Sequence, residues 1–154
     1  MEQIKRFTLD EWYITPFTAR RVFDEDGIMT WVPLERNLHP TGQRQLDFIA
    51  LSMAEGNADF DWMASRLGCL SSDLYGLMSA LTGVDGRQFR LDWMFRLADD
   101  MLRYTKMTVN EVARHSGFRS SSFLCQKFRE YRHTTPDDYR RTVQSPREAG
   151  RYRV

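Results

Sequence analysis

The stretch Met107–Thr142, MTVNEVARHSGFRSSSFLCQKFREYRHTTPDDYRRT, predicts two short helices joined by a tight turn. The first helix has apolar residues at i, i+3 and i+4 and places Ala113 four positions before Gly117. The small side chain lets a second helix cross closely, and the glycine permits the positive φ of a sharp turn. The second helix opens on serines that can cap it and turns Leu124 and Phe128 inward, so its polar side chains face outward. This layout is that of a helix-turn-helix, whose outward face enters the major groove of DNA.

A longer pattern of regularly spaced residues runs through the same stretch. Its members are Gly117, Phe118, Ser120, Ser122, Phe123, Phe128, Arg129, Thr135, Pro136, Tyr139 and Arg140. The pattern resembles the C-terminal signature of AraC/XylS-type transcription regulators, a bacterial family. The resemblance implies an all-α DNA-binding region in which a long helix joins two helix-turn-helix units, with about seven helices in total.

The second unit carries the side chains that the resemblance implies for DNA contact. Its outward positions match the base-contacting ones of the family: Ser121, Ser122, Cys125 and Gln126. A glutamine amide suits N6 and N7 of adenine, and serine hydroxyls both accept and donate. Neighbouring side chains, mostly basic, are predicted to contact phosphates: Arg119, Ser120, Lys127, Arg129 and Arg132. Gln126 stands where the family often has arginine, so a preference for guanine is not implied.

An internal repeat places a similar unit earlier in the chain. Ala64 and Gly68 precede Ala113 and Gly117 by 49 residues. Beyond the turn the offset is 50. It pairs Leu74 with Leu124, Met78 with Phe128, Gly83 with His133, and Phe89 with Tyr139. The intervening residues 87–104 carry a continuous apolar stripe, which predicts the long connecting helix. The repeat and the resemblance together cover residues 43–142.

The first unit departs from the family pattern. Leu67–Gly86 contains no Lys or Arg, and Leu70 stands in the place of the usual capping serine. Its outward side chains are predicted to make weaker contacts than those of the second unit: Ser71, Ser72, Asp73 and Tyr75. Asp73 repels phosphates, although a carboxylate can accept a hydrogen bond from cytosine. Base reading and a scaffold role both stay open for this unit. In the second unit, His133 replaces the usual glycine, so we expect a helix exit that is strained or differently shaped.

Residues 1–42 predict an N-terminal extension, with its boundary at Pro40–Gly42. Two strand-like runs, Thr18–Phe23 and Ile28–Pro33, flank a turn sequence and favour a β-hairpin. A lone hairpin is marginal in water, so the many aromatic rings of this extension should pack on the helical body or on a partner chain, giving a homodimer. The extension is too short for the effector-binding β-barrel that family members often carry. Residues 143–154 predict a basic, flexible tail.

Composition and charge narrow the class of function. The net charge of +1 conceals a basic last third, because residues 105–154 carry eleven Lys/Arg against five Asp/Glu, a net +6. Affinity for a polyanion should therefore concentrate there. The sequence shows no membrane span and no signal peptide, and the two cysteines lie outside any CxxC motif, which predicts a reduced, cytoplasmic setting. The three histidines lack ligand spacing, so no metal or other cofactor is expected. Asp99 and Asp100 are interpreted as a solvated helix edge and not as a catalytic pair, and the chain is not expected to be an enzyme.

Together these observations predict a sequence-specific, DNA-binding transcription regulator whose second helix-turn-helix is the main reader of the major groove. Double-stranded DNA is the expected partner, with RNA polymerase as a further candidate. The alternative is a co-regulator that binds proteins through a partly degenerate helix-turn-helix repeat. The acidic first unit favours that alternative, whereas the basic last third disfavours it.

Overall fold

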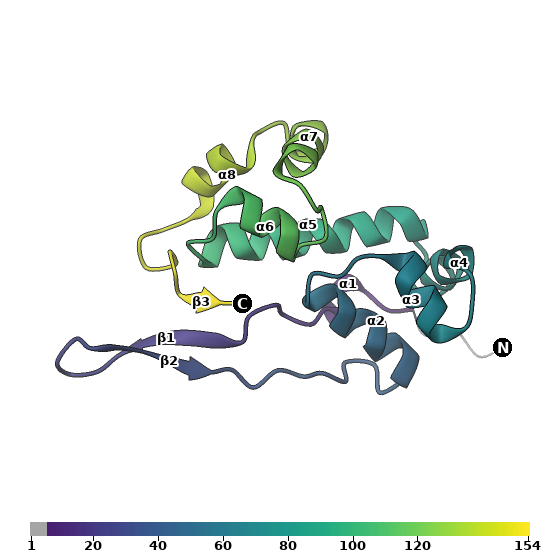
Figure 1. Ribbon diagram of the computed structural model, residues 1–154, viewed down its shortest axis with the longest axis horizontal. Coiled ribbons are helices and arrows are strands. Elements are labelled where there is room, and N and C mark those ends of the chain that lie inside the picture. The colour runs from purple at the N-terminus through teal and green to yellow at the C-terminus, as the bar shows by residue number, and fades with distance from the viewer. Residues whose placement is uncertain (1–5) are drawn as a thin grey trace.

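Helix α5 (Gly86–Tyr104) runs through the centre of the molecule, with the other elements arranged around it (Figure 1). The Asp85 carboxylate accepts hydrogen bonds from the backbone amides of Arg87 and Gln88, which fixes the start of the helix. The computed structural model describes residues 6–154, and in it α5 is the predicted connecting helix. Its buried side chains form the expected apolar stripe: Phe89, Trp93, Met94, Phe95, Leu97, Ala98, Met101 and Leu102.

Two units of three helices each flank α5, as the sequence predicted. The first consists of α2 (Arg44–Ala54), α3 (Phe60–Leu67) and α4 (Ser71–Thr82). The second consists of α6 (Val109–His115), α7 (Ser121–Arg132) and α8 (Pro136–Val143). Figure 1 shows α3 and α4 near one end of α5 and the second unit toward the other end. With the short α1 (Leu9–Trp12), residues 6–154 contain eight helices, one more than the sequence indicated.

The internal repeat is present in the backbone and in the core. Gly68 follows α3 and Gly117 follows α6, and they have positive φ values of 72° and 89°. Three of the paired apolar positions are buried in both units: Ala64 with Ala113, Leu74 with Leu124, and Met78 with Phe128. In the fourth pair Phe89 is buried and Tyr139 is half-buried. These equivalent positions therefore form the core of both units. The offset between them changes from 49 to 50 residues in the turn.

Glycine permits a close approach between the two units. A Cβ on Gly117 would lie 2.5 Å from the Cβ of Ala58, in the loop between α2 and α3. From the same loop, a Cβ on Gly56 would lie 2.9 Å from the backbone oxygen of His115 at the end of α6. The Arg90 guanidinium holds this loop on α5 by donating two hydrogen bonds, of 2.9 and 2.6 Å, to the Ala58 carbonyl. The units are thus in direct contact as well as linked by α5.

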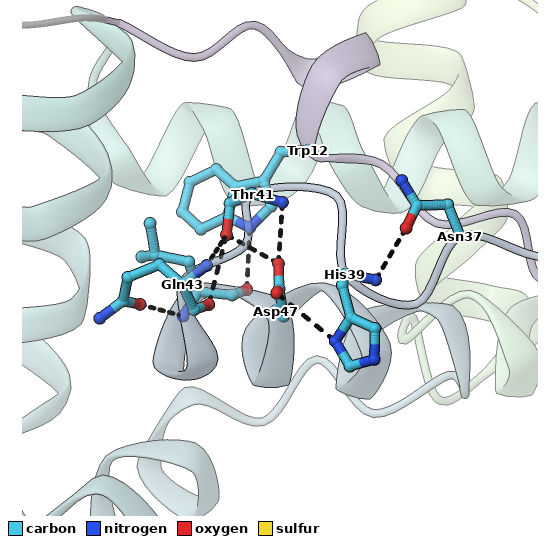
Figure 2. A network of polar contacts seen from close by, with 7 residues as sticks. Trp12, Asn37, His39, Thr41, Gln43 and Asp47 are labelled. Atoms are coloured by element: carbon cyan, nitrogen blue, oxygen red, sulfur yellow. Dashed lines mark hydrogen bonds and ion pairs between the residues drawn. The ribbon is translucent and has the colours of Figure 1, made fainter.

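Trp12 anchors the N-terminal extension on the helical body. It ends α1, is fully buried, and its indole N–H donates to the Leu46 carbonyl of α2 at 2.9 Å (Figure 2). Its ring centroid lies 5.4 Å from that of Trp93 on α5. The extension therefore packs on α2 and α5, which is one of the two arrangements expected from its aromatic content. The homodimer stays a prediction.

The predicted boundary at residues 40–42 is a hydrogen-bonded corner against α2. Figure 2 shows the buried Asp47 carboxylate facing Thr41, whose backbone N–H and hydroxyl donate to it at 2.9 and 2.7 Å. His39 Nδ1 lies 3.8 Å from the same carboxylate. The side chain of Gln43 caps α2 by accepting from the Leu46 amide. These contacts fix the direction in which the chain enters the first unit.

A three-stranded antiparallel sheet contains the predicted hairpin, formed by β1 (Ala19–Phe23) and β2 (Met29–Pro33). The expectation of a flexible tail was wrong for the end of the chain, because β3 (Tyr152–Arg153) pairs with β1 in the order β2-β1-β3. The edge of β1 that does not pair with β2 supplies the backbone N–H and C=O groups that bind β3. The Tyr152 ring also stacks on Phe17 at a centroid distance of 4.8 Å, which buries apolar surface that a loose tail would expose.

His133 ends α7 in the left-handed conformation, with φ 57°, as expected for a strained exit. The equivalent Gly83 ends α4 with φ 74°. The left-handed conformation costs a residue with a Cβ about 1–2 kcal/mol of folding free energy. Glycine avoids that cost but loses about 0.5–1 kcal/mol more in backbone entropy when the chain folds. We therefore expect His133→Gly to raise the free energy of unfolding by about 0.5–1 kcal/mol. Urea unfolding measures this, and the reciprocal control Gly83→Ala should lower stability by about 1 kcal/mol. Equal stability of both variants and the parent would contradict the assignment of strain.

Candidate nucleic-acid interface

Helix α7 presents one polar face to solvent and one apolar face to the core. The Ser120 hydroxyl caps its start by accepting from the Phe123 amide at 3.2 Å. Leu124 and Phe128 are fully buried, and the Phe128 ring lies 5.4 Å from Phe95 of α5. The side chains on the opposite face line one open hollow: Ser121, Ser122, Cys125, Gln126, Arg129 and Glu130. The structure therefore brings all four predicted base-contacting residues together on one surface.

Glu130 is a member of this surface that the sequence analysis missed. Its carboxylate accepts a hydrogen bond from the Gln126 amide at 3.1 Å and lies 3.2 Å from the Lys127 ammonium. These hydrogen bonds lower the pKa of the Glu130 carboxyl below its ordinary value. The contact with Glu130 uses one of the two N–H groups of the Gln126 amide and orients that side chain along the helix. The i, i+3 and i, i+4 spacing on a helix was the available signal.

The four basic residues predicted to contact phosphates fall into two groups, while the fifth predicted residue, Ser120, is the α7 cap. Arg129 is exposed and forms no ion pair within residues 6–154, and the Arg119 side chain is 79% exposed at 3.5 Å from Asp59. Lys127 is less available, because it pairs with Glu130 and its side chain is only 23% exposed. Arg132 points to α5, where its guanidinium lies 2.7 Å from the Asp99 carboxylate. Arg119 and Arg129 are thus the two of these cations that carboxylates engage least closely.

Asp99 and Asp100 are structural groups, which corrects their interpretation as a solvated edge. Asp99 is partly buried and pairs with Arg132, so it ties the end of α7 to α5. Burial raises the pKa of the Asp99 carboxyl, and the Arg132 guanidinium opposes that rise. Asp100 accepts a hydrogen bond from the Tyr13 hydroxyl at 2.7 Å. Burial and the Asp100 charge both raise the pKa of Tyr13, so this hydroxyl stays protonated. Adjacent carboxylates therefore hold the second unit and the N-terminal extension on one helix.

Helix α4 of the first unit has a different surface. Ser71 and Ser72 lie at its start, with Ser72 exposed. Asp73 accepts a hydrogen bond from the Leu70 amide at 2.9 Å, so its carboxylate forms the half of a capping box that does not need a serine at position 70. The Tyr75 ring stacks on Phe60 at 4.9 Å, and the Arg87 guanidinium lies 4.4 Å from its centroid. Two of the four predicted weaker contacts, Asp73 and Tyr75, thus have partners inside the protein.

Two helix-turn-helix units on one connecting helix define a double helix-turn-helix protein. The family model described as a helix-turn-helix domain matches residues 63–142, more than half of the chain. The chain therefore belongs to the AraC-type helix-turn-helix family of transcription regulators. A comparison with curated protein sequences gave no significant match.

Solved structures show the same fold. The C-terminal domain of the two-component response regulator YesN from Fusobacterium nucleatum is 22% identical, with a TM-score of 0.54 over 63% of this chain and 94% of that chain. The DNA-binding domain of AdpA, a global transcriptional factor, was solved in complex with a target DNA. It is 24% identical, with a TM-score of 0.53 over 64% of this chain and 90% of that chain.

Residues 6–154 contain no group of three or more His, Cys, Asp or Glu side chains placed to hold a metal ion. None of their helices has the length and apolar character needed to cross a membrane.

Proposed function

We propose that this chain binds double-stranded DNA and regulates transcription, with α7 as the main reader of the major groove. The observation that carries this proposal is the polar surface of α7. Five of its side chains suit bases or phosphates and share one hollow: Ser121, Ser122, Cys125, Gln126 and Arg129. The helix beneath them is held by buried Leu124 and Phe128 and by the Arg132–Asp99 ion pair. A rigid helix whose polar outer face also offers an arginine is what groove recognition requires.

The connecting helix supports a two-groove arrangement. Its 19 residues span about 28 Å at about 1.5 Å per residue. One turn of DNA is about 34 Å long, so α4 would reach a neighbouring major groove on the same face of the duplex. The target DNA bound to the AdpA domain supports the same class of ligand here. We assign α4 the weaker contact because Leu67–Gly86 carries no cation and Asp73 is committed to its cap.

The proposal is tested by selecting bound duplexes from a random pool and measuring affinity for the recovered sequence against salt. Arg129→Ala is expected to weaken binding uniformly across sequences and to reduce the slope of log K against log salt by about 1, because one phosphate contact is lost. Arg141→Ala is the matched control: Arg141 is an exposed arginine on α8, where it pairs with Asp138. Failure to enrich any duplex would refute DNA binding. An unchanged slope for Arg129→Ala would place the phosphate contacts elsewhere.

A second candidate function is suggested by apolar exposure on the first unit. Leu70 and Leu77 of the α4 region are 69% and 38% exposed, and no Lys or Arg lies between Leu67 and Gly86. Such a surface suits a protein partner, such as RNA polymerase, better than a polyanion. Leu77→Glu would then abolish regulation in cells while leaving duplex affinity in vitro unchanged, whereas an equal loss of both would assign α4 to DNA.

A further inference from the structure

A surface cavity of about 510 Å³ lies between the three-stranded sheet and the start of the second unit. Figure 1 shows β3 beside β1, on the side of the sheet that faces α6. The lining comes from all three strands, from the connection between α5 and α6, and from α6 itself. The cavity shares no residue with the hollow on α7, so it is a separate feature of the molecule.

Positive charge is concentrated in this cavity. Four of its lining side chains are permanent cations at neutral pH: Arg21, Lys106, Arg114 and Arg153. None of the four forms an ion pair within residues 6–154. The acidic residue in the described lining, Glu111, accepts a hydrogen bond from the Thr108 amide at 2.8 Å as part of the α6 cap. The lining therefore carries four cationic side chains against one carboxylate, and that carboxylate is held in the α6 cap.

Local contacts hold two of these cations in place. The Arg21 guanidinium donates to the carbonyls of Ala149 and Arg147, at 3.0 and 3.4 Å, which orients it without neutralising it. The Lys106 stem lies against Gly150, where a Cβ would come within 3.1 Å of Lys106 Cε. Gly150 has φ 73°, and its bare backbone gives the lysine stem room to lie across the end of the sheet. The charged groups are thus positioned by the fold.

Part of the cavity lining is aromatic and apolar. Trp31 of β2 lines the cavity and is half-buried, and the Arg153 guanidinium lies 5.0 Å from its ring centroid. Met29 and Met107 add polarizable side chains that adapt to a planar ligand. A ligand that satisfies both parts of the lining needs an anionic group for the cations and a flat apolar ring for Trp31.

We propose that this cavity binds a small aromatic carboxylate. The carboxylate would accept charge-assisted hydrogen bonds from Arg114 and Arg153, since arginine binds carboxylates in a two-pronged geometry. The ring would lie against Trp31 and the two methionines. This site lies outside the surface proposed to read DNA, and the pairing of β3 with β1 supplies part of its lining.

The proposal is tested by calorimetric titration of the full chain with 2-naphthoate, in the absence of DNA, with the Trp31 indole N–H signal followed by NMR. We expect saturable one-to-one binding that shifts this signal. The uncharged 2-naphthamide and inorganic phosphate should each bind at least tenfold more weakly, because one lacks the charge and the other the ring. The Arg114→Gln, Arg153→Gln double variant should lose at least tenfold in affinity, and the Arg141→Gln control should bind as the parent does.

Both substituted arginines are exposed, so the double variant should keep the parent's unfolding temperature, which is measured alongside. The absence of saturable binding would overturn the proposal, as would equal binding of 2-naphthamide or an unchanged affinity of the double variant. Because no DNA is present, these outcomes are independent of the proposed transcriptional function.

Discussion

Replacement of Trp12 by alanine is expected to lower the free energy of unfolding by about 3–5 kcal/mol, the usual cost of deleting a fully buried large aromatic side chain. Trp12 is 0% exposed, and its ring packs on Trp93 and Phe89 of α5. Its indole N–H also donates to the Leu46 carbonyl, which joins the extension to α2. The substitution would leave a cavity among three elements and remove their shared hydrogen bond. The N-terminal extension is thus predicted to be part of the cooperative core.

Urea unfolding followed by circular dichroism measures this loss, and Trp62→Ala is the control. Trp62 lies on α3, is 38% exposed and stacks on Phe48 at 5.8 Å. Its removal should cost about 1–2 kcal/mol, because much of its surface is already in water. If Trp12→Ala cost no more than Trp62→Ala, the extension would be a loosely attached segment and not part of the core.

The helical framework was predictable because its determinants are local. Ala113 and Gly117, with their counterparts Ala64 and Gly68, specify a close crossing and a left-handed turn within a few residues of chain. The hairpin was likewise predictable from two strand-like runs around a turn sequence. Residue periodicity and turn residues indicate the conformation of the segment that contains them. The helices, their turns and the hairpin could therefore be predicted without knowing which distant residues they contact.

The features that the sequence did not reveal depend on distant partners. The pairing of β3 with β1 joins Tyr152 to Arg20 across most of the chain, and a two-residue strand has no periodicity to detect. Arg132 was predicted to contact phosphate, yet its partner Asp99 lies 33 residues away on another helix. From sequence alone an arginine is interpreted as a solvated cation, because its partly buried carboxylate partner is not visible. Residue type alone therefore could not show which cations are available to a ligand. The structure shows that Lys127 and Arg132 pair closely with carboxylates, whereas Arg119 and Arg129 do not.

The substitution Ser122→Glu is expected to lower affinity for the selected duplex at least 100-fold. Ser122 is the second residue of α7 and is exposed in the hollow proposed to face the bases. A carboxylate there would face phosphates and base edges, and like-charge juxtaposition in an interface costs several kcal/mol. A penalty of about 3 kcal/mol corresponds to about a 100-fold loss. A glutamate in the first turn also suits the helix dipole, so the variant should fold as the parent does.

The internal repeat provides a matched control for this substitution. Ser72 is the second residue of α4, lies 50 positions before Ser122 and is likewise exposed. Because α4 is assigned the weaker contact, Ser72→Glu should lower affinity less than about threefold, well under 1.4 kcal/mol. Equal losses from both variants would mean that both helices enter grooves and would overturn the assignment of α7 as the main reader. No loss from either would remove both helices from the grooves and leave the protein-partner function as the better account. The identical chemistry at two equivalent positions therefore separates a defect in DNA reading from a general effect of added negative charge.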